Sequence, residues 1–149
     1  MADPIDSDVI VSAITFWKKV YDEMWTTKRD ENLLLLRVFR GEILLNTKVG
    51  RVYVSMLYEN SFEIASLLIK NQLLAKQTAK VLDELLPSIE SLLSSDEMEL
   101  SQDTIENLET LLNKFESKAS PKLKTAIRKV EKDINERKVL KQLGIIISE

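Results

Sequence analysis

Residues 101–116 read SQDTIENLETLLNKFE, a segment that combines a helix start signal with a regular apolar stripe. Ser101 stands where a side-chain oxygen can accept hydrogen bonds from the free amide groups of a first helical turn. Four apolar side chains then return at intervals of three or four residues: Ile105, Leu108, Leu112 and Phe115. This interval places side chains on one face of an α-helix. The segment therefore predicts an amphipathic helix over residues 102–116.

The segment that follows carries the same signals. Ser120-Pro121 predicts a helix start, because proline suits the first helical position. The inner stripe of this helix comprises Leu123, Ile127, Val130 and Ile134. We expect the helix to reach about Leu143, where Gly144 stops it. Residues 101–143 would then form a helical hairpin.

The composition extends this helical pattern to the whole chain. Glycine and proline each occur three times among 149 residues, too few for the many tight turns of a sandwich or a barrel. The hydrophobic fraction of 44% and the charged fraction of 30% are ordinary for a folded domain. We therefore predict an all-α fold in which residues 1–149 form a single domain. It would be a bundle of about six or seven helices that ends in the hairpin.

Weaker signals place the earlier helices. Residues 8–26 are expected to form a first helix whose stripe packs in the core and comprises Ile10, Ile14, Trp17, Tyr21 and Trp25. Thr27 with Asp30 resembles a capping box for a second helix over residues 31–45.

Breaks are expected at a glycine, at an asparagine and at a proline. Gly50 predicts a helix-ending position with positive φ, at a break over residues 46–50. Further helices are expected over 51–58, 62–70 and 72–86, with boundaries at Glu59-Asn60 and near Asn71. Pro87 lacks an amide donor and clashes with the preceding turn, so the helix should bend or restart there.

Charge is segregated along the chain, although the net charge is only −3. Residues 82–112 hold nine acidic side chains and no basic one, whereas residues 114–141 hold ten basic and four acidic ones, a net of +6. Opposite charges that face each other across the hairpin would explain this pattern, and we favour that interpretation. Alternatively, the last helix presents Lys122, Arg128 and Lys129 to the phosphates of a nucleic acid or of another ligand.

An ordered series of residues in the first half has a counterpart in a known family. The series comprises Leu36-Arg37-Val38-Phe39-Arg40, Leu44-Leu45, Gly50-Arg51, Val54, Tyr58, Ser61, Ala65 and Ile69. It resembles the CFI-box C-terminal domain, a small helical module at the ends of many bacterial and archaeal proteins, over about residues 36–93. The resemblance implies a prokaryotic origin and a helical region over about residues 8–93. The family's Cys-Phe-Ile box is absent, since its nearest counterpart is Val9-Ile10-Val11-Ser12-Ala13, and Phe62 replaces the family's proline.

Three arginines of this series form the candidate polar site: Arg37, Arg40 and Arg51. Forked hydrogen bonds from guanidinium groups suit a phosphate or a carboxylate ligand. Alternatively, these arginines pair with Glu42, Glu59 or Glu63 and tie short helices together. We favour the structural interpretation.

The residue types argue against catalysis. Without histidine or cysteine, the chain lacks the commonest general base, the thiol nucleophile and the commonest metal ligands. It also lacks both glycine-rich phosphate-binding motifs. We predict no enzyme activity, no metal and no cofactor. An acidic start without a signal peptide, and a longest apolar run that spans only residues 33–36, predict a cytoplasmic protein.

These observations predict a non-enzymatic helical module that acts through protein contacts, with a partner protein or as a homo-oligomer. Two apolar segments are the interface candidates: Leu33 and Leu34, and the tail Ile145, Ile146 and Ile147. The alternative is binding of a nucleic acid or a phosphate ligand through the basic helix or the three arginines. Membrane association is the least favoured.

Overall fold

The computed structural model describes residues 18–22, 24–25 and 28–148. After a helical stretch at residues 18–22, its elements are helix α2 (Arg29–Glu42), the 3-10 helix η1 (Leu44–Asn46), α3 (Lys48–Lys70), α4 (Gln72–Ser95), strand β1 (Met98–Leu100), α5 (Gln102–Glu116), α6 (Pro121–Glu136), α7 (Lys138–Gln142) and strand β2 (Ile145–Ile147). The predicted all-α class is confirmed. Much of the helix expected over 8–26, with Ile10, Ile14 and Trp17, lies outside the described residues, as does Thr27.

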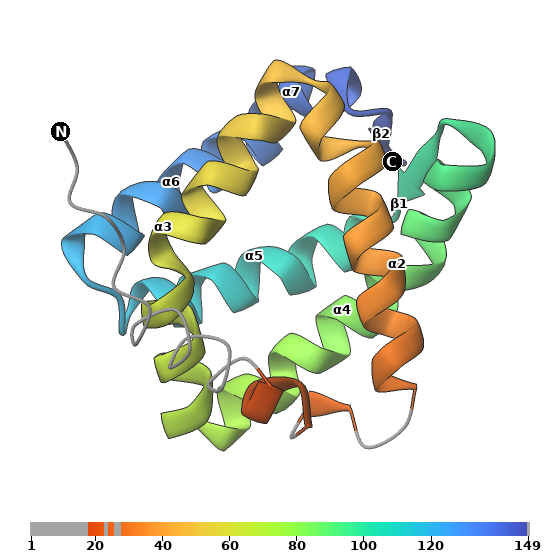
Figure 1. Cartoon of the computed structure of the whole chain (residues 1–149). Helices are drawn as coiled ribbons and strands as arrows, with labels where there is room; N and C mark the ends of the chain where they lie inside the picture. The colour runs from red at the N-terminus through yellow and green to blue at the C-terminus, as the bar shows by residue number, and fades with distance from the viewer. Residues whose placement is uncertain (1–17, 23, 26–27, 149) are drawn as a thin grey trace, which may run out of the picture.

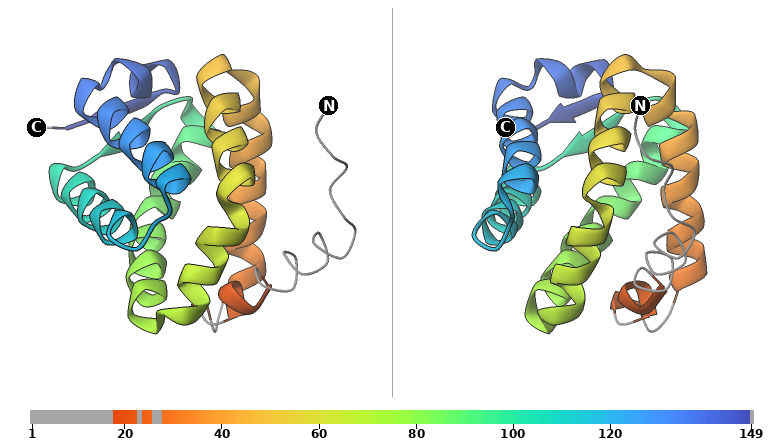
Figure 2. Two further views of the ribbon diagram at one scale, coloured as in Figure 1. Left: turned by 90° about the vertical axis from the view of Figure 1, so that its left-hand side faces the viewer. Right: turned by 60° about the vertical axis from the view of Figure 1, so that its left-hand side comes forward.

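The helices are arranged in three layers (Figure 1). In the right-hand view of Figure 2, α2 lies on one side, α5 and α6 lie on the other, and α3 and α4 lie between them. Helix α4 contacts α2, α3 and α5, and α6 contacts α5 and α3. Leu85, Leu108 and Leu112 pack against both apolar clusters of the core, which joins the two clusters. Within the described residues, no helix has the length and apolar character needed to cross a membrane.

Helices α5 and α6 begin where the sequence predicts. The Ser101 hydroxyl accepts a hydrogen bond from the Thr104 amide at 3.1 Å, and the Ser120 hydroxyl accepts one from the Leu123 amide at 3.3 Å. Each cap satisfies an amide that has no partner within the helix. The buried residues of both stripes are Ile105, Phe115, Leu123, Ile127 and Ile134. The cap signals and stripes of the hairpin therefore predicted its two helices correctly.

The predicted continuation of the last helix to Leu143 is wrong. The chain changes direction at Arg137, which has a left-handed backbone with a φ of 61° and separates α6 from α7. Gly144 follows α7 with a φ of 86°, a conformation that glycine adopts without strain. The glycine thus ends the helical region as predicted, but one helix later.

Helix α3 is continuous where the sequence predicts two helices. Asn60, expected at a boundary, is buried in its interior and donates a hydrogen bond from Nδ2 to the Met56 carbonyl at 2.8 Å. Val54, Ala65 and Leu68 are also buried on α3. Burial of this apolar face stabilises the helix through its polar positions, because packing contributes more than local propensity.

Gly50 has a different role from the predicted one. It lies in the first turn of α3, where its amide donates to the hydroxyl of the capping residue Thr47 at 2.9 Å. A Cβ atom at this position would lie 2.0 Å from the carbonyl oxygen of Leu44. Gly50 is therefore needed for the close approach of α3 to η1, and the prediction of a positive φ is wrong.

Helix α4 passes through Pro87 without ending. Proline removes one helical hydrogen bond and crowds the preceding turn. Leu86 and Ile89 are nevertheless buried on either side of it. The predicted restart at Pro87 is wrong, because the apolar face of α4 stays packed across the proline.

Two short strands tie the C-terminal tail to the rest of the fold. Strands β1 and β2 pair in parallel, with Met98 opposite Ile145 and Leu100 opposite Ile147. Met98, Leu100 and Ile145 are buried, and Ile147 packs against the same cluster. The tail therefore docks on its own chain, which removes Ile145 and Ile147 from the predicted interface and leaves Ile146 partly exposed.

Candidate protein-binding groove

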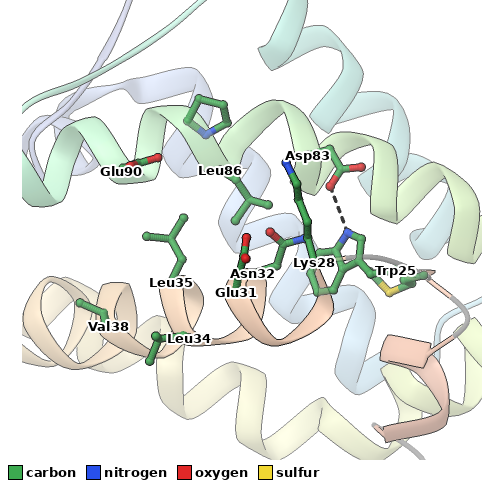
Figure 3. Close-up of a pocket in the computed structure, with 12 residues that line it drawn as sticks. Trp25, Lys28, Glu31, Asn32, Leu34, Leu35, Val38, Asp83, Leu86 and Glu90 are labelled. Atoms are coloured by element: carbon green, nitrogen blue, oxygen red, sulfur yellow. Dashed lines mark hydrogen bonds between the residues drawn. The ribbon is translucent and has the colours of Figure 1, made fainter.

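Helix α2 contributes no side chain to the buried core. None of its 14 residues, all of which the structure describes, is buried. Leu34 is 61% exposed. Beside it, a groove of about 950 Å³ runs between α2 and α4 (Figure 3). A large exposed side chain at the edge of a groove is a feature of protein-binding surfaces.

The floor of this groove is apolar. Helix α2 contributes Leu35 and Val38, and α4 contributes Leu86 and Pro87, whereas Leu34 lies at the edge of the groove. Figure 3 shows Leu35 and Leu86 pointing into the space between the two helices. Leu86 is buried, whereas Leu34 and Pro87 are exposed. The floor thus extends from the buried core at Leu86 to the exposed side chain of Pro87.

One end of the groove is closed by Trp25. Its indole Nε1 donates a hydrogen bond to Asp83 Oδ1 on α4 at 3.0 Å. The ring of Tyr21 stacks on it, with ring centroids 6.1 Å apart and an interplanar angle of 9°. Trp25 is buried, which confirms the expectation of a core position for this member of the aromatic stripe.

The rim of the groove is acidic. Glu31, Asp83 and Glu90 line it, against a single lysine at position 28 among the described lining residues. All four side chains belong to exposed residues. Carboxylates beside an apolar floor favour a segment that carries basic residues next to its apolar side chains. The groove therefore combines an apolar floor with a negatively charged rim.

The two predicted interface leucines of α2 separate in space. Leu34 lines the groove, whereas Leu33 is half-buried and lines a cavity on the other side of α2. Residues one apart on a helix do not share a face. Sequence analysis singled out Leu34 and Trp25 but missed Asp83, Leu86 and Glu90. The acidic run of residues 82–112 indicated that negative charge is concentrated in this part of the chain, but not that it lines a groove beside α2.

The three predicted arginines do not form one site. Arg40 donates to the Tyr58 hydroxyl at 3.0 Å, and Arg51 donates to the Leu45 carbonyl at 3.1 Å. Arg37 is exposed. Over the part of the chain that the structure describes, no ion pair joins any of the three to Glu42, Glu59 or Glu63, the partners that we expected.

Glu63 has a different partner from the expected arginines. Its carboxylate accepts hydrogen bonds from the Ser120 amide at 2.7 Å and from the Ser120 hydroxyl. These contacts tie α3 to the residue that caps α6.

The basic residues of α6 make contacts within the protein. Lys122 donates to the Glu59 carbonyl at 3.1 Å, and Arg128 lies 2.9 Å from a carboxylate oxygen of Glu116. Of the ion pairs between described residues, this last one alone joins α6 to α5. The expected charge pairing across the hairpin thus consists of one pair, not of a ladder.

Lys129, itself exposed, belongs to a polar contact between α3 and α6 that is centred on the buried carboxylate of Asp133. Its Nζ lies 3.1 Å from Asp133 Oδ2 and 5.9 Å from the centre of the Tyr53 ring. The Tyr53 hydroxyl donates to the same oxygen at 2.6 Å. Burial, and then the hydrogen bond to the negative carboxylate, raise the pKa of Tyr53. The phenol therefore stays protonated and holds the two helices together.

Comparisons with known proteins do not place the chain in a family, since no family model, no curated protein and no solved structure matches it. The described residues also hold no cluster of three or more acidic, histidine or cysteine side chains that could bind a metal ion. The description of the groove therefore depends only on its geometry and charge in this structure.

Proposed function

We propose that this protein is a non-enzymatic helical interaction module that binds an amphipathic, basic segment of a partner protein in the groove between α2 and α4. The observation that carries the proposal is Leu34, which is 61% exposed beside an apolar floor and three carboxylates. A helix of the partner would lay its apolar stripe on this floor, in the manner of helix-in-groove recognition. Its basic residues would meet Glu31 and Glu90.

Phosphate binding by α6, the alternative, has weaker support. Lys122, Arg128 and Lys129 each contact an oxygen atom of the protein itself. A phosphate would have to compete with these contacts. Membership of the CFI-box C-terminal domain family, which residues 36–93 suggest, stays a prediction.

The test uses two labelled model peptides of about 14 residues, which form roughly four helical turns. One alternates leucine and lysine at helical spacing, and the other replaces every lysine by glutamate. Fluorescence anisotropy measures their affinity for the wild type and for three variants. Leu34→Glu places a charge at the edge of the groove. A double variant, Glu31→Lys with Glu90→Lys, reverses the rim. Leu73→Glu is the matched control, because Leu73 is 70% exposed and lies outside the groove.

We expect the lysine peptide to bind the wild type at least about tenfold more tightly than the glutamate peptide, which corresponds to about 1.4 kcal/mol. Leu34→Glu should weaken binding by about the same factor, the double variant should reverse the preference, and Leu73→Glu should change neither. Equal losses in Leu34→Glu and Leu73→Glu would contradict the proposal. So would light scattering that shows a wild-type dimer and a Leu34→Glu monomer, because a second copy would then occupy the groove.

A further inference from the structure

The middle of helix α3 has an inward-facing leucine that is not packed. Leu57 is 48% exposed, although Val54 and Asn60, three residues before and after it on the same face, are only 4% exposed. A position between two buried neighbours is expected to be buried as well. Its exposure is explained by a cavity that Leu57 lines.

This cavity has two adjoining compartments on the side of α2 that faces away from the groove. The inner one, of about 380 Å³, is enclosed mainly by α3, α4, α5 and α6, and the outer one, of about 620 Å³, has more residues of α2 in its lining. Both are lined by Phe39, Tyr53, Leu57, Ile64, Leu123 and Ile127. Volumes of ~300–1,000 Å³ with an apolar lining are typical of small-molecule sites. In Figure 1, α2 and α3 flank this region and α5 crosses behind it.

One residue that lines the inner compartment has an unsatisfied hydrogen-bond acceptor. This residue is Asn60, and the Nδ2 atom of Asn60 donates to the Met56 carbonyl at 2.8 Å. The Oδ1 atom is buried and has no hydrogen-bond partner among the described residues. A buried acceptor without a donor destabilises a fold by about 1–3 kcal/mol. Asn60 Oδ1 has almost no accessible surface, so a bound hydroxyl group would satisfy it after the side chain turns this atom toward the cavity.

The outer compartment is electropositive. Arg37, Arg40 and Tyr21 line it together with apolar side chains. Burial raises the pKa of the Tyr21 phenol, and the positive charges of Arg37 and Arg40 oppose this rise. Both guanidinium groups therefore act on the same region of the cavity. Arg37 is exposed and forms no ion pair within the described residues, so it can receive an anion.

We propose that this cavity binds a hydroxylated medium- or long-chain carboxylic acid. Its carboxylate would lie at Arg37 and Arg40, its aliphatic chain along Leu57 and Ile127, and its hydroxyl group would donate to Asn60 Oδ1. The apolar lining suits the chain, and the two polar ends suit the two head groups. This site shares only Met24 with the lining of the groove, so the small molecule and the partner segment would bind to opposite sides of α2.

The experiment is isothermal titration calorimetry of the full chain with three probes: dodecanoate, 12-hydroxydodecanoate and dodecan-1-ol. All titrations stay below the micelle concentration of the probe. Leu57→Trp fills the cavity at a position that is already open, and Val52→Trp is the matched control, because Val52 is exposed on the same helix and does not line the cavity. Arg37→Gln is a surface variant that leaves the core intact, and Asn60→Leu removes the acceptor.

We expect saturable one-to-one binding, with 12-hydroxydodecanoate the tightest probe. Leu57→Trp should weaken all three probes at least about tenfold, and Val52→Trp should leave them unchanged. Arg37→Gln should weaken the two carboxylates several-fold and spare the alcohol, whereas Asn60→Leu should remove the advantage of the hydroxyl group. Absence of saturable binding by the wild type would overturn the proposal. Equal losses in Leu57→Trp and Val52→Trp, or in carboxylate and alcohol binding by Arg37→Gln, would also overturn it. Peptide binding in the groove is measured in a separate experiment, so one of the two proposals can be contradicted while the other holds.

Discussion

Helices α2 and α6 are of similar length and both are amphipathic, but they use their apolar faces differently. Helix α6 buries Leu123, Ile127 and Ile134 between α5 and α3, and it also buries the carboxylate of Asp133. Helix α2 fully buries none of its residues, all of them described, and contacts α4 and η1, while Leu35, Leu36 and Phe39 pack against the core as partly buried side chains. An outer helix with one neighbouring layer leaves apolar surface on both of its sides.

We expect this difference to make α6 important mainly for stability and α2 important mainly for binding. The apolar side chains of α6 are mostly buried and contribute mainly to the free energy of unfolding, and two of them, Leu123 and Ile127, also line the cavity. The apolar surface of α2 borders the groove on one side and the cavity on the other. Substitutions in α6 should therefore change stability, and substitutions in α2 should change binding.

Truncation of one residue in each helix makes the largest contrast. Ile134→Ala in α6 should destabilise the protein by about 2–5 kcal/mol, because it leaves a cavity among buried side chains. Leu34→Ala in α2 should change stability by about 0.5 kcal/mol or less, because the side chain is exposed. Urea denaturation followed by circular dichroism measures both. Similar values for the two variants would remove the distinction between the helices.

The two helical glycines on either side of η1 provide the second contrast. Gly50→Ala brings a Cβ atom to 2.0 Å from the Leu44 carbonyl oxygen and should destabilise the protein by about 3 kcal/mol. Gly41→Ala meets no atom within 4 Å and should stabilise α2 by about 0.5–1 kcal/mol. Thermal denaturation is the measurement. A neutral Gly50→Ala would mean that α3 and η1 can separate without loss of stability.

Two tyrosines of α3, one half-buried and one exposed, provide the third contrast. Tyr53→Phe removes the hydroxyl that donates to buried Asp133 and should destabilise the protein by about 2 kcal/mol. Tyr58→Phe removes an exposed acceptor of Arg40 and should change stability by about 0.5 kcal/mol or less. Chemical denaturation at neutral pH distinguishes them. Equal effects would show that the contact between α3 and α6 does not depend on the buried carboxylate.

The smallest expected effect depends on pH and concerns Glu131 on α6. Burial, and then the nearby negative charge of Glu116, raise the pKa of Glu131. The protonated carboxyl is therefore favoured in the folded state. The contribution of Glu131 to stability is full below its unfolded pKa of about 4.3 and is lost as the pH rises through the higher folded value.

Glu131→Gln should accordingly raise the melting temperature slightly at pH 7 and lose this advantage towards pH 4. Glu136→Gln is the control, because Glu136 is exposed and pairs with Lys132 at 3.9 Å. Differential scanning calorimetry across this pH range is the measurement. A larger gain at pH 4 than at pH 7 would show that the sign of the pKa change is wrong.

Local patterns predicted the helices correctly where caps and stripes agreed, as at Ser101 and Ser120. They failed where packing outweighed a local signal. Asn60 and Pro87 both weaken a helix locally, yet α3 and α4 continue through them because buried neighbours hold each helix on the core. Arg137 carries no signal for a left-handed backbone, so the division between α6 and α7 could not be predicted.

The groove was predictable only in part. Four consecutive leucines make α2 apolar around most of its circumference, which indicated either a central helix or a contact surface and made Leu34 a candidate; of the four, only Leu34 is exposed. Asp83 and Leu86 join it from α4, about 50 residues further along the chain. Periodicity indicates which side of a helix turns inward, but not which other helix lies opposite.

Taken alone, the order of residues establishes that this chain is helical, where its capped helices begin, and which chemistry it lacks. These properties depend on neighbours within a few positions. The three layers, the docking of the isoleucine tail, the open side of α2 and the unpacked Leu57 arise from contacts between distant segments. Such contacts depend on how whole surfaces fit together, and no short stretch of sequence contains that information.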